Sequence, residues 1–245
     1  NVSGTQVLTP GASFDSGRLD FQTNSIGGNF IAPSLNFRGL GNGSLSIVDG
    51  PAGSPNDNFI YRGTDLIDTF TVTAASATVG TVRLNSQILV NLTDITQLTL
   101  AGLADDDVFV VPGVVPFSGI TLDGGEPAAS DLLVYTPATA TTTTVNLAAG
   151  QLTSSAAGSP TVSLIGIETV NALGSNGAVD RFVVNGFGSA APIKTLNLSG
   201  GDTNNNDGDT ITVNTTSGPD TITYTPLSNA SATITRSASD PVINV

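Results

Sequence analysis

The chain has 245 residues, a formal net charge of −13 and only 11% charged residues, and it contains no Cys, His, Met or Trp. That length allows one large domain or two smaller ones. The negative charge excludes nucleic acid and anionic membrane surfaces as partners, since both require a basic face. Membrane insertion is not expected either, because no apolar run approaches the roughly 18 residues of a spanning helix.

The acidic residues are eighteen Asp and two Glu. Asp competes with the helix backbone for hydrogen bonds and prefers turns, whereas helical surfaces favour Glu. Short runs such as "DTFTVTAA" and "DTITVNTT" alternate apolar residues with Thr, Ser or Asn, which is the two-residue period of half-buried strands. The sequence therefore predicts an all-β protein.

Residues 1–40 fit no repeat, and we expect them to form an N-terminal cap or an assembly segment. From residue 41 onward one motif recurs, Asp-x-apolar-x-Val/Tyr. It begins at Asp57, Asp68, Asp107, Asp131, Asp180, Asp209 and Asp220. Each Asp is predicted to lie at a turn-to-strand junction, with its side chain in the turn.

A longer period contains these motifs. The segment "VNLTDITQLTLAGLADDDVFVV" (90–111) matches "VSLIGIETVNALGSNGAVDRFVV" (162–184), with four apolar positions displaced by 72. Repetition at this scale indicates a solenoid or a tandem array. We predict degenerate repeats of about 75 residues, over about 41–111, 112–184 and 185–245.

The favoured fold is a right-handed parallel β-solenoid, similar to a β-helix or β-roll. The alternative is a set of tandem antiparallel β-sandwich domains, because stretches such as 68–92 can also be drawn as a hairpin around "ATVG". In the solenoid, equivalent inward positions would form the core. They are Phe59, Phe70, Phe109, Leu133, Phe182, Ile211 and Ile222.

The run "LIGIETVNALGSNGAVDRFVV", with "DGGEPAASDLLVY" and "SGGDTNNNDGDTITV", resembles degenerate haemolysin-type (RTX-like) calcium-binding repeats of large bacterial cell-surface and adhesin-like proteins. The resemblance covers roughly residues 40–225. It implies a stacked β architecture in which turn carboxylates and carbonyls bind Ca²⁺ between coils. No strict nonapeptide of that family occurs, so the tight nine-residue roll is not implied.

Short carboxylates beside Gly and Asn suit Ca²⁺, which takes six to eight oxygen ligands on flexible loops. The candidate metal ligands lie in three loops, with Ca²⁺ as the expected cofactor. They are Asp105, Asp106 and Asp107; Asp202, Asp207 and Asp209; and Asp65 with Asp68. The alternative reading needs no metal, because Asp side chains also stabilise turns by accepting backbone N–H bonds.

Catalysis is not expected. Without His or Cys the usual nucleophile–base pairs cannot be built, and a carbohydrate-active β-helix enzyme remains only as a weak alternative, using carboxylates and Lys194. The favoured function is an extracellular, non-enzymatic structural protein, calcium-stabilised, that self-associates into a surface layer, a fibre or an adhesin stalk. The second reading is a calcium-dependent module that binds a cell surface or a surface polysaccharide.

The C-terminal "DPVINV" ends partway through a repeat. We expect this segment to be an uncapped strand that docks on the first 40 residues of a neighbouring copy, since an exposed strand edge promotes further pairing. Deleting 234–245 would then abolish assembly.

Overall fold

The computed structural model describes residues 4–25, 28–31, 33–48, 57–126, 130–175, 177–187, 193–201, 208–217, 221–228, 231–236 and 241–245. Over these residues the protein is all-β, as predicted, with no helix and two large mixed sheets. No helix in this part of the chain could therefore cross a membrane.

The two sheets contain twelve and eleven strands. Sheet A consists of β1 (Gly4–Pro10), β2 (Gly17–Ser25), β3 (Gly28–Ile31), β4 (Leu35–Phe37), β6 (Asn58–Arg62), β10 (Gln97–Ala101), β12 (Gly119–Asp123), β14 (Thr142–Asn146), β15 (Gln151–Ser154), β16 (Thr161–Ile165), β18 (Arg181–Phe187) and β20 (Thr210–Thr215). Sheet B consists of β5 (Ser44–Val48), β7 (Thr69–Ala74), β8 (Val79–Leu84), β9 (Leu89–Thr93), β11 (Val108–Pro112), β13 (Leu132–Thr136), β17 (Thr169–Leu173), β19 (Thr195–Ser199), β21 (Thr223–Ser228), β22 (Ser231–Thr235) and β23 (Val242–Asn244).

Most strands alternate buried and half-buried residues along their length, as in β10, β11, β12 and β13. The apolar residues of the predicted period-two pattern face the space between the sheets, and Thr, Ser and Asn face outward. Burial of one side chain such as Leu or Phe stabilises the fold by about 1.5–3 kcal/mol. The alternation therefore determines which face of each strand points inward.

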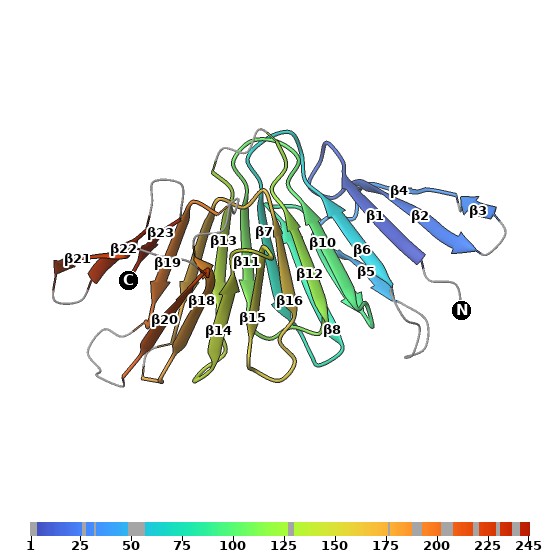
Figure 1. The fold of residues 1–245 in the computed structure, drawn as a ribbon. Helices are drawn as coiled ribbons and strands as arrows, with labels where there is room; N and C mark the ends of the chain where they lie inside the picture. Colours follow the sequence, from blue (N-terminus) through green and yellow to red (C-terminus); the bar gives the residue numbers. More distant parts are fainter. Residues whose placement is uncertain are drawn as a thin grey trace.

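Successive strands alternate between the sheets over long stretches of the chain. From β10 to β13 the order is sheet A, B, A, B, and the same alternation runs from β16 to β20. Within these stretches, strands that follow each other in one sheet pair in parallel, for example β10 with β12, β11 with β13 and β17 with β19. The exception is β16, which pairs with β12 and β15 and not with β18. Figure 1 shows the strands lying side by side from the blue N-terminal end to the red C-terminal end.

After the N-terminal meander β1–β2–β3 in sheet A, three further antiparallel meanders interrupt this alternation: β7–β8–β9 in sheet B, β14–β15–β16 in sheet A and β21–β22–β23 in sheet B. The meanders that start with β7 and β14 begin 73 residues apart, at 69 and 142, and those that start with β14 and β21 begin 81 apart, at 142 and 223. Equivalent strands are thus seven apart in chain order, and each step of seven changes the sheet. The matched segments of the sequence repeat follow this rule, since Val90 lies on β9 in sheet B and Val162 on β16 in sheet A.

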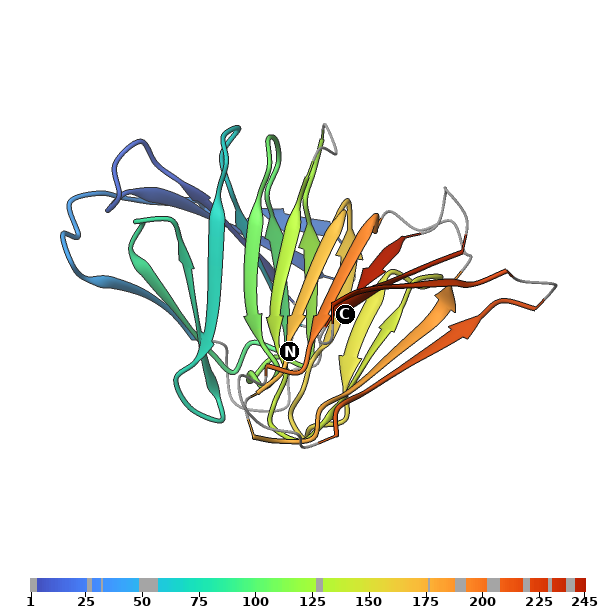
Figure 2. The ribbon, with the colours of Figure 1, turned by 90° about the vertical axis from the view of Figure 1, so that its left-hand side faces the viewer.

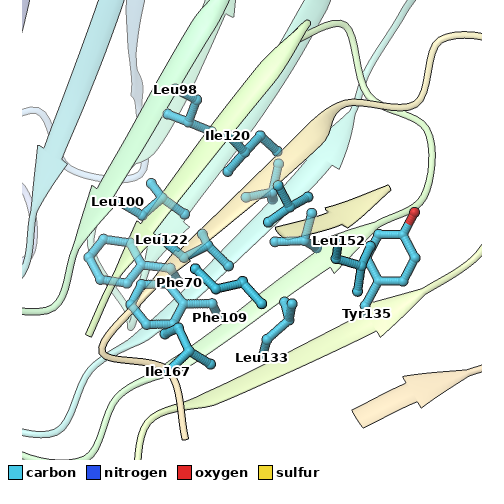
Figure 3. Packing of buried hydrophobic residues seen from close by; sticks show 14 of the residues in the cluster. Phe70, Leu98, Leu100, Phe109, Ile120, Leu122, Leu133, Tyr135, Leu152 and Ile167 are labelled. Carbon is cyan, nitrogen blue, oxygen red and sulfur yellow. The ribbon is translucent and has the colours of Figure 1, made fainter. Parts of the chain in front are cut away.

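One continuous core lies between the sheets. Sheet A contributes rows such as Leu98 with Ile120, and sheet B contributes the stacked rings of Phe70 and Phe109, whose centroids are 5.4 Å apart (Figure 3). Five of the predicted core residues are buried. They are Phe59, Phe70, Phe109, Leu133 and Phe182.

Ile211 is only partly buried, and the prediction for Ile222 is wrong, since its side chain is 45% exposed. Both residues lie at the C-terminal end of the sheets, on β20 and directly before β21. These are the outermost strands there, and no other strand of the described residues covers them.

The C-terminal strand is not a free edge, contrary to the expectation for "DPVINV". β23 pairs in parallel with β19 on one side and antiparallel with β22 on the other, and Ile243 on it is fully buried. The chain folds back through the β21–β22 hairpin, which places β21 outside β23. The N- and C-termini lie at opposite ends of the row of strands (Figure 1).

Candidate functional site

Five of the motif aspartates are almost completely buried: Asp57, Asp68, Asp107, Asp131 and Asp180. Each one directly precedes a strand. A buried carboxylate is costly unless it accepts hydrogen bonds. The local structure must therefore supply donors that the sequence pattern alone does not reveal.

The donors are backbone N–H groups of neighbouring strands. In sheet B the N–H of Asp68 donates to Oδ1 of Asp107 (2.8 Å), the N–H of Asp107 to Oδ1 of Asp131 (2.7 Å), and the N–H of Asp131 to Oε2 of Glu168 (3.0 Å). We call these four residues the carboxylate column. It joins the starts of β7, β11, β13 and β17, so it fixes the register of four parallel strands.

Glycines on the facing turns leave room for these side chains. A Cβ atom on Gly102 would overlap Oδ2 of Asp107, and one on Gly124 would overlap Oδ2 of Asp131. A Cβ on Gly63 would lie 2.5 Å from Oδ2 of Asp68. Each of these glycines directly follows a sheet A strand. A glycine at the end of the strand is therefore required for the later Asp to pack there.

The members of the column differ in the hydrogen bonds that their second carboxylate oxygen accepts. Oδ2 of Asp68 accepts bonds from the N–H (2.5 Å) and hydroxyl (3.1 Å) of Thr64, and Asn85 donates to its Oδ1. Oδ2 of Asp107 and Oδ2 of Asp131 are buried and have no hydrogen-bond partner among the described residues. These two oxygens mark the part of the column where negative charge is least compensated.

Burial raises the pKa of Asp107 from 3.8 to about 7, and the charges of Asp68, Asp131 and Asp105 add to this shift, against the N–H bond from Asp68. Burial also raises the pKa of Asp131, with further contributions from Asp106 and Asp123, and the pKa of Glu168. Asp107 therefore holds a proton at mildly acidic pH, which reduces repulsion along the column.

The predicted metal ligands are only partly brought together. Asp68 and Asp107 belong to the column, Asp65 and Asp105 are exposed, Asp106 and Asp209 are half-buried, and Asp202 and Asp207 lie outside the described residues. In the described part of the chain no three acidic side chains come close enough to hold one ion. Calcium binding stays a prediction.

A second, shorter column lies in sheet A. The N–H of Asp180, before β18, donates to Oδ1 of Asp209, before β20 (2.7 Å), and Asn214 donates to Asn185 along the same two strands (2.8 Å). This column ends at β20, which pairs only with β18 among the described strands. The end that faces the viewer in Figure 2 carries these orange and red C-terminal strands.

Both sheets have open edges at both ends. In sheet A these are β20 at the C-terminal end and β4 with β3 beyond β2 at the N-terminal end; in sheet B they are β21 and β5. Within the described residues each of these strands pairs on one side only. These edges are suited to bind another polypeptide, because their unpaired backbone N–H and C=O groups can form hydrogen bonds with a further strand.

A surface groove of about 560 Å³ lies among the turns around Ala77, Val115 and Ser159. Its lining is apolar apart from three serine hydroxyls and includes no ionisable side chain among the described residues. It therefore offers no acid, base or charged ligand for chemistry. Lys194, the candidate for the enzymatic alternative, is exposed beside β19.

Comparison with protein-family models, curated proteins and solved structures finds no match to this chain.

Proposed function

We propose that this protein is a non-enzymatic structural component of an extracellular surface, and that it self-associates head to tail through the open edges of its two sheets. One observation carries the proposal. Within each sheet the two open edge strands run in the same direction, so a second copy stacked end to end would continue both sheets with parallel pairing.

The direction follows from the chain of pairings in sheet A. From β4 the path crosses two antiparallel pairs (β4–β2, β2–β1) before the parallel run β1–β6–β10–β12–β16. It then crosses two more antiparallel pairs (β16–β15, β15–β14) and two parallel ones to β20. The even number of reversals leaves β4 and β20 parallel.

Sheet B has the same property. The path from β5 crosses the β9–β8 and β8–β7 reversals, follows a parallel run to β23, and crosses two further reversals to β21. β5 and β21 are therefore parallel too. A head-to-tail contact is heterologous and builds an open chain of molecules rather than a closed dimer.

Apolar side chains left uncovered at both ends support the same contact. At the N-terminal end Leu35 is 50% and Val48 66% exposed; at the C-terminal end Tyr224 is 63% and Leu227 65% exposed. Burial of such residues between copies would add about 25 cal/mol for each Å² of apolar surface removed from water.

We also propose the finer architecture on which this stacking depends, a right-handed parallel solenoid with meander insertions. It is supported by the alternation of sheets from β10 to β13 and from β16 to β20. Crossovers between parallel strands of one sheet are right-handed in nearly all proteins. The extracellular location rests on composition, because the chain lacks the side chains most easily oxidised, Cys and Met.

Sedimentation velocity across a concentration series tests the proposal. Thr212 is exposed on β20, and a lysine on an open edge strand disfavours further pairing. We expect Thr212→Lys to weaken self-association by about tenfold or more. Thr144 occupies the same row of sheet A, in register with Val183 and Thr212, but on the internal strand β14.

Thr144→Lys is therefore the matched control and should leave association unchanged. Thermal melts of both variants establish that the monomer remains folded. Sedimentation of the unmodified protein as a single-chain species at every concentration would overturn the proposed function.

A further inference from the structure

Two internal strands, β6 in sheet A and β13 in sheet B, indicate which kind of strand can pair with the open edge of β20. β6 follows Asp57 and pairs in parallel with β10, and β13 follows Asp131 and pairs in parallel with β17. β6, β13 and β20 are equivalent strands, seven apart in chain order, and all follow a motif Asp. β6 and β13 each have a parallel partner on both edges. β20 pairs only with β18 among the described strands, so it lacks the partner that corresponds to β10 and β17.

The two strands that fill this position share a pattern. With the residue that follows each strand, β10 reads "QLTLAG" (97–102) and β17 reads "TVNALG" (169–174). In both segments the second and fourth residues are buried, whereas the first, third and fifth are exposed or half-buried. A glycine directly follows each strand. In both pairs the first residue of this pattern lies opposite the residue that follows the motif Asp.

The same pattern occurs at the opposite end of the molecule, in "SLNFRG" (34–39), which contains β4. Leu35 and Phe37 take the two apolar positions and Gly39 the final glycine, which has a positive φ of 72°. Among the described strands β4 pairs only with β2, at its other edge, and Leu35 on it is half exposed. The first 40 residues therefore carry a strand of the type that β20 lacks.

We infer that β4 of a second copy docks in parallel on the open edge of β20, with Leu35 opposite Ile211, Asn36 opposite Thr212 and Phe37 opposite Val213. This inference rests on the proposed function and names the strands and the register of the contact. The partner is thus a second copy of this chain, joined through sheet A.

The backbone of β20 is oriented for this pairing. The N–H groups of Thr210 and Thr216 donate toward β18, to Asp180 (3.0 Å) and Phe187 (3.3 Å). Alternation along the strand then turns the N–H and C=O groups of Ile211 and Val213 toward the open edge. The same two side chains are only half-buried against the core, so the docked Leu35 would cover them.

Strand direction agrees with the inferred register. β4 and β20 are parallel within one molecule, and translation of a copy along the row of strands preserves that direction. The outward positions are compatible as well, because Asn36 and Thr212 are both exposed and uncharged. Thr121 and Thr99 form an equivalent outward polar pair between β12 and β10.

Cysteine cross-linking tests the register, since the chain contains no Cys. Protein carrying Thr212→Cys is mixed with protein carrying Asn36→Cys, oxidised mildly and separated on a non-reducing gel. In-register parallel neighbours have Cα atoms about 4.8 Å apart, which a disulfide spans. Arg38→Cys, two residues along the same face of β4, would lie about 8 Å from position 212 and is the matched control.

We expect the 212–36 mixture to yield about tenfold more mixed disulfide dimer than the 212–38 mixture or a Thr144→Cys plus Asn36→Cys mixture. If the unmodified protein associates but 212–36 links no better than these controls, the β4–β20 assignment is wrong and the proposed function stands. If the unmodified protein does not associate at all, both are wrong.

Discussion

Leu103 adopts a backbone conformation that L-residues avoid. Its φ is +87°, in the turn between β10 and β11. The equivalent turns after β12 and β19 have Gly125 (φ +92°) and Gly201 (φ +84°) at this place, each directly after another glycine. Only glycine adopts such angles without steric cost. Leu103 therefore strains a turn that is built with glycine after β12 and β19.

We expect Leu103→Gly to raise the free energy of unfolding by about 1 kcal/mol, since the strain removed exceeds the loss of a partly exposed side chain. Urea denaturation measures the change. Leu103→Ala is the control, because it removes the same side chain but keeps a Cβ in the left-handed conformation. Equal effects of the two variants would show that strain is not the cause.

Asp107 makes stability depend on pH in an unusual direction. Its folded pKa, about 7, exceeds its ordinary value of 3.8, so the folded protein binds this proton more tightly than the unfolded chain does. The stabilisation is complete below about pH 3.8 and is lost as the pH rises to about 7. The facing groups Asp68, Asp131 and Asp105 are acidic and act in the same sense.

Melting temperature measured from pH 4 to 8 should therefore fall toward neutral pH, and Asp107→Asn should flatten this fall. Asparagine keeps an oxygen for the N–H of Asp68 but carries no charge. Asp15 provides a contrast of opposite sign, because the Gly41 N–H lowers its pKa, so Asp15→Asn should change only the acidic limb. A pH profile of Asp107→Asn identical to that of the unmodified protein would contradict this role.

At the scale of the element, the turns between the sheets depend on glycine–carboxylate packing. Gly102→Ala would place a methyl group on Oδ2 of Asp107, and we expect a loss of about 1–3 kcal/mol in the free energy of unfolding. Gly4→Ala is the control, since the nearest atom to its Cβ would be 3.7 Å away. A loss no larger than that of the control would show that the turn adjusts freely.

The strands and their inward faces could be predicted from sequence because alternation of apolar and polar residues reports burial directly. Phe59, Phe70 and Phe109 are buried as expected. Pairing could not be predicted in the same way. Alternation does not show that β14, β15 and β16 form a meander in one sheet, nor that an open edge leaves Ile222 exposed, because both depend on contacts distant in the chain.

The candidate site was predicted in part. The motif correctly predicted that Asp68 and Asp107 lie at strand starts. We expected their side chains to be metal ligands in turns, whereas both are buried and accept hydrogen bonds from backbone N–H groups. Two signals were missed. Glu168 continues the column without matching the motif, and the glycine before each Asp, such as Gly102, marks a carboxylate that packs inside the turn.

At the scale of the whole molecule, the two ends of the row of strands present different edge strands. This arrangement determines which substitutions can test assembly. Deletion of 234–245 would remove β23, an internal strand with the fully buried Ile243. Loss of assembly after that deletion could reflect unfolding alone. Substitution of exposed residues on β20 separates assembly from stability, because none of the strands that the structure describes pairs with that edge in the folded chain.

Electron microscopy of filaments grown with a small fraction of Thr212→Lys protein tests head-to-tail stacking most directly. This variant keeps the N-terminal edge strands, so it should add to a growing end and then block further growth there. We expect unbranched filaments that shorten as the fraction of Thr212→Lys rises and keep their length with Thr144→Lys. Single-chain particles, closed two-fold dimers, or filaments unaffected by Thr212→Lys would contradict the account.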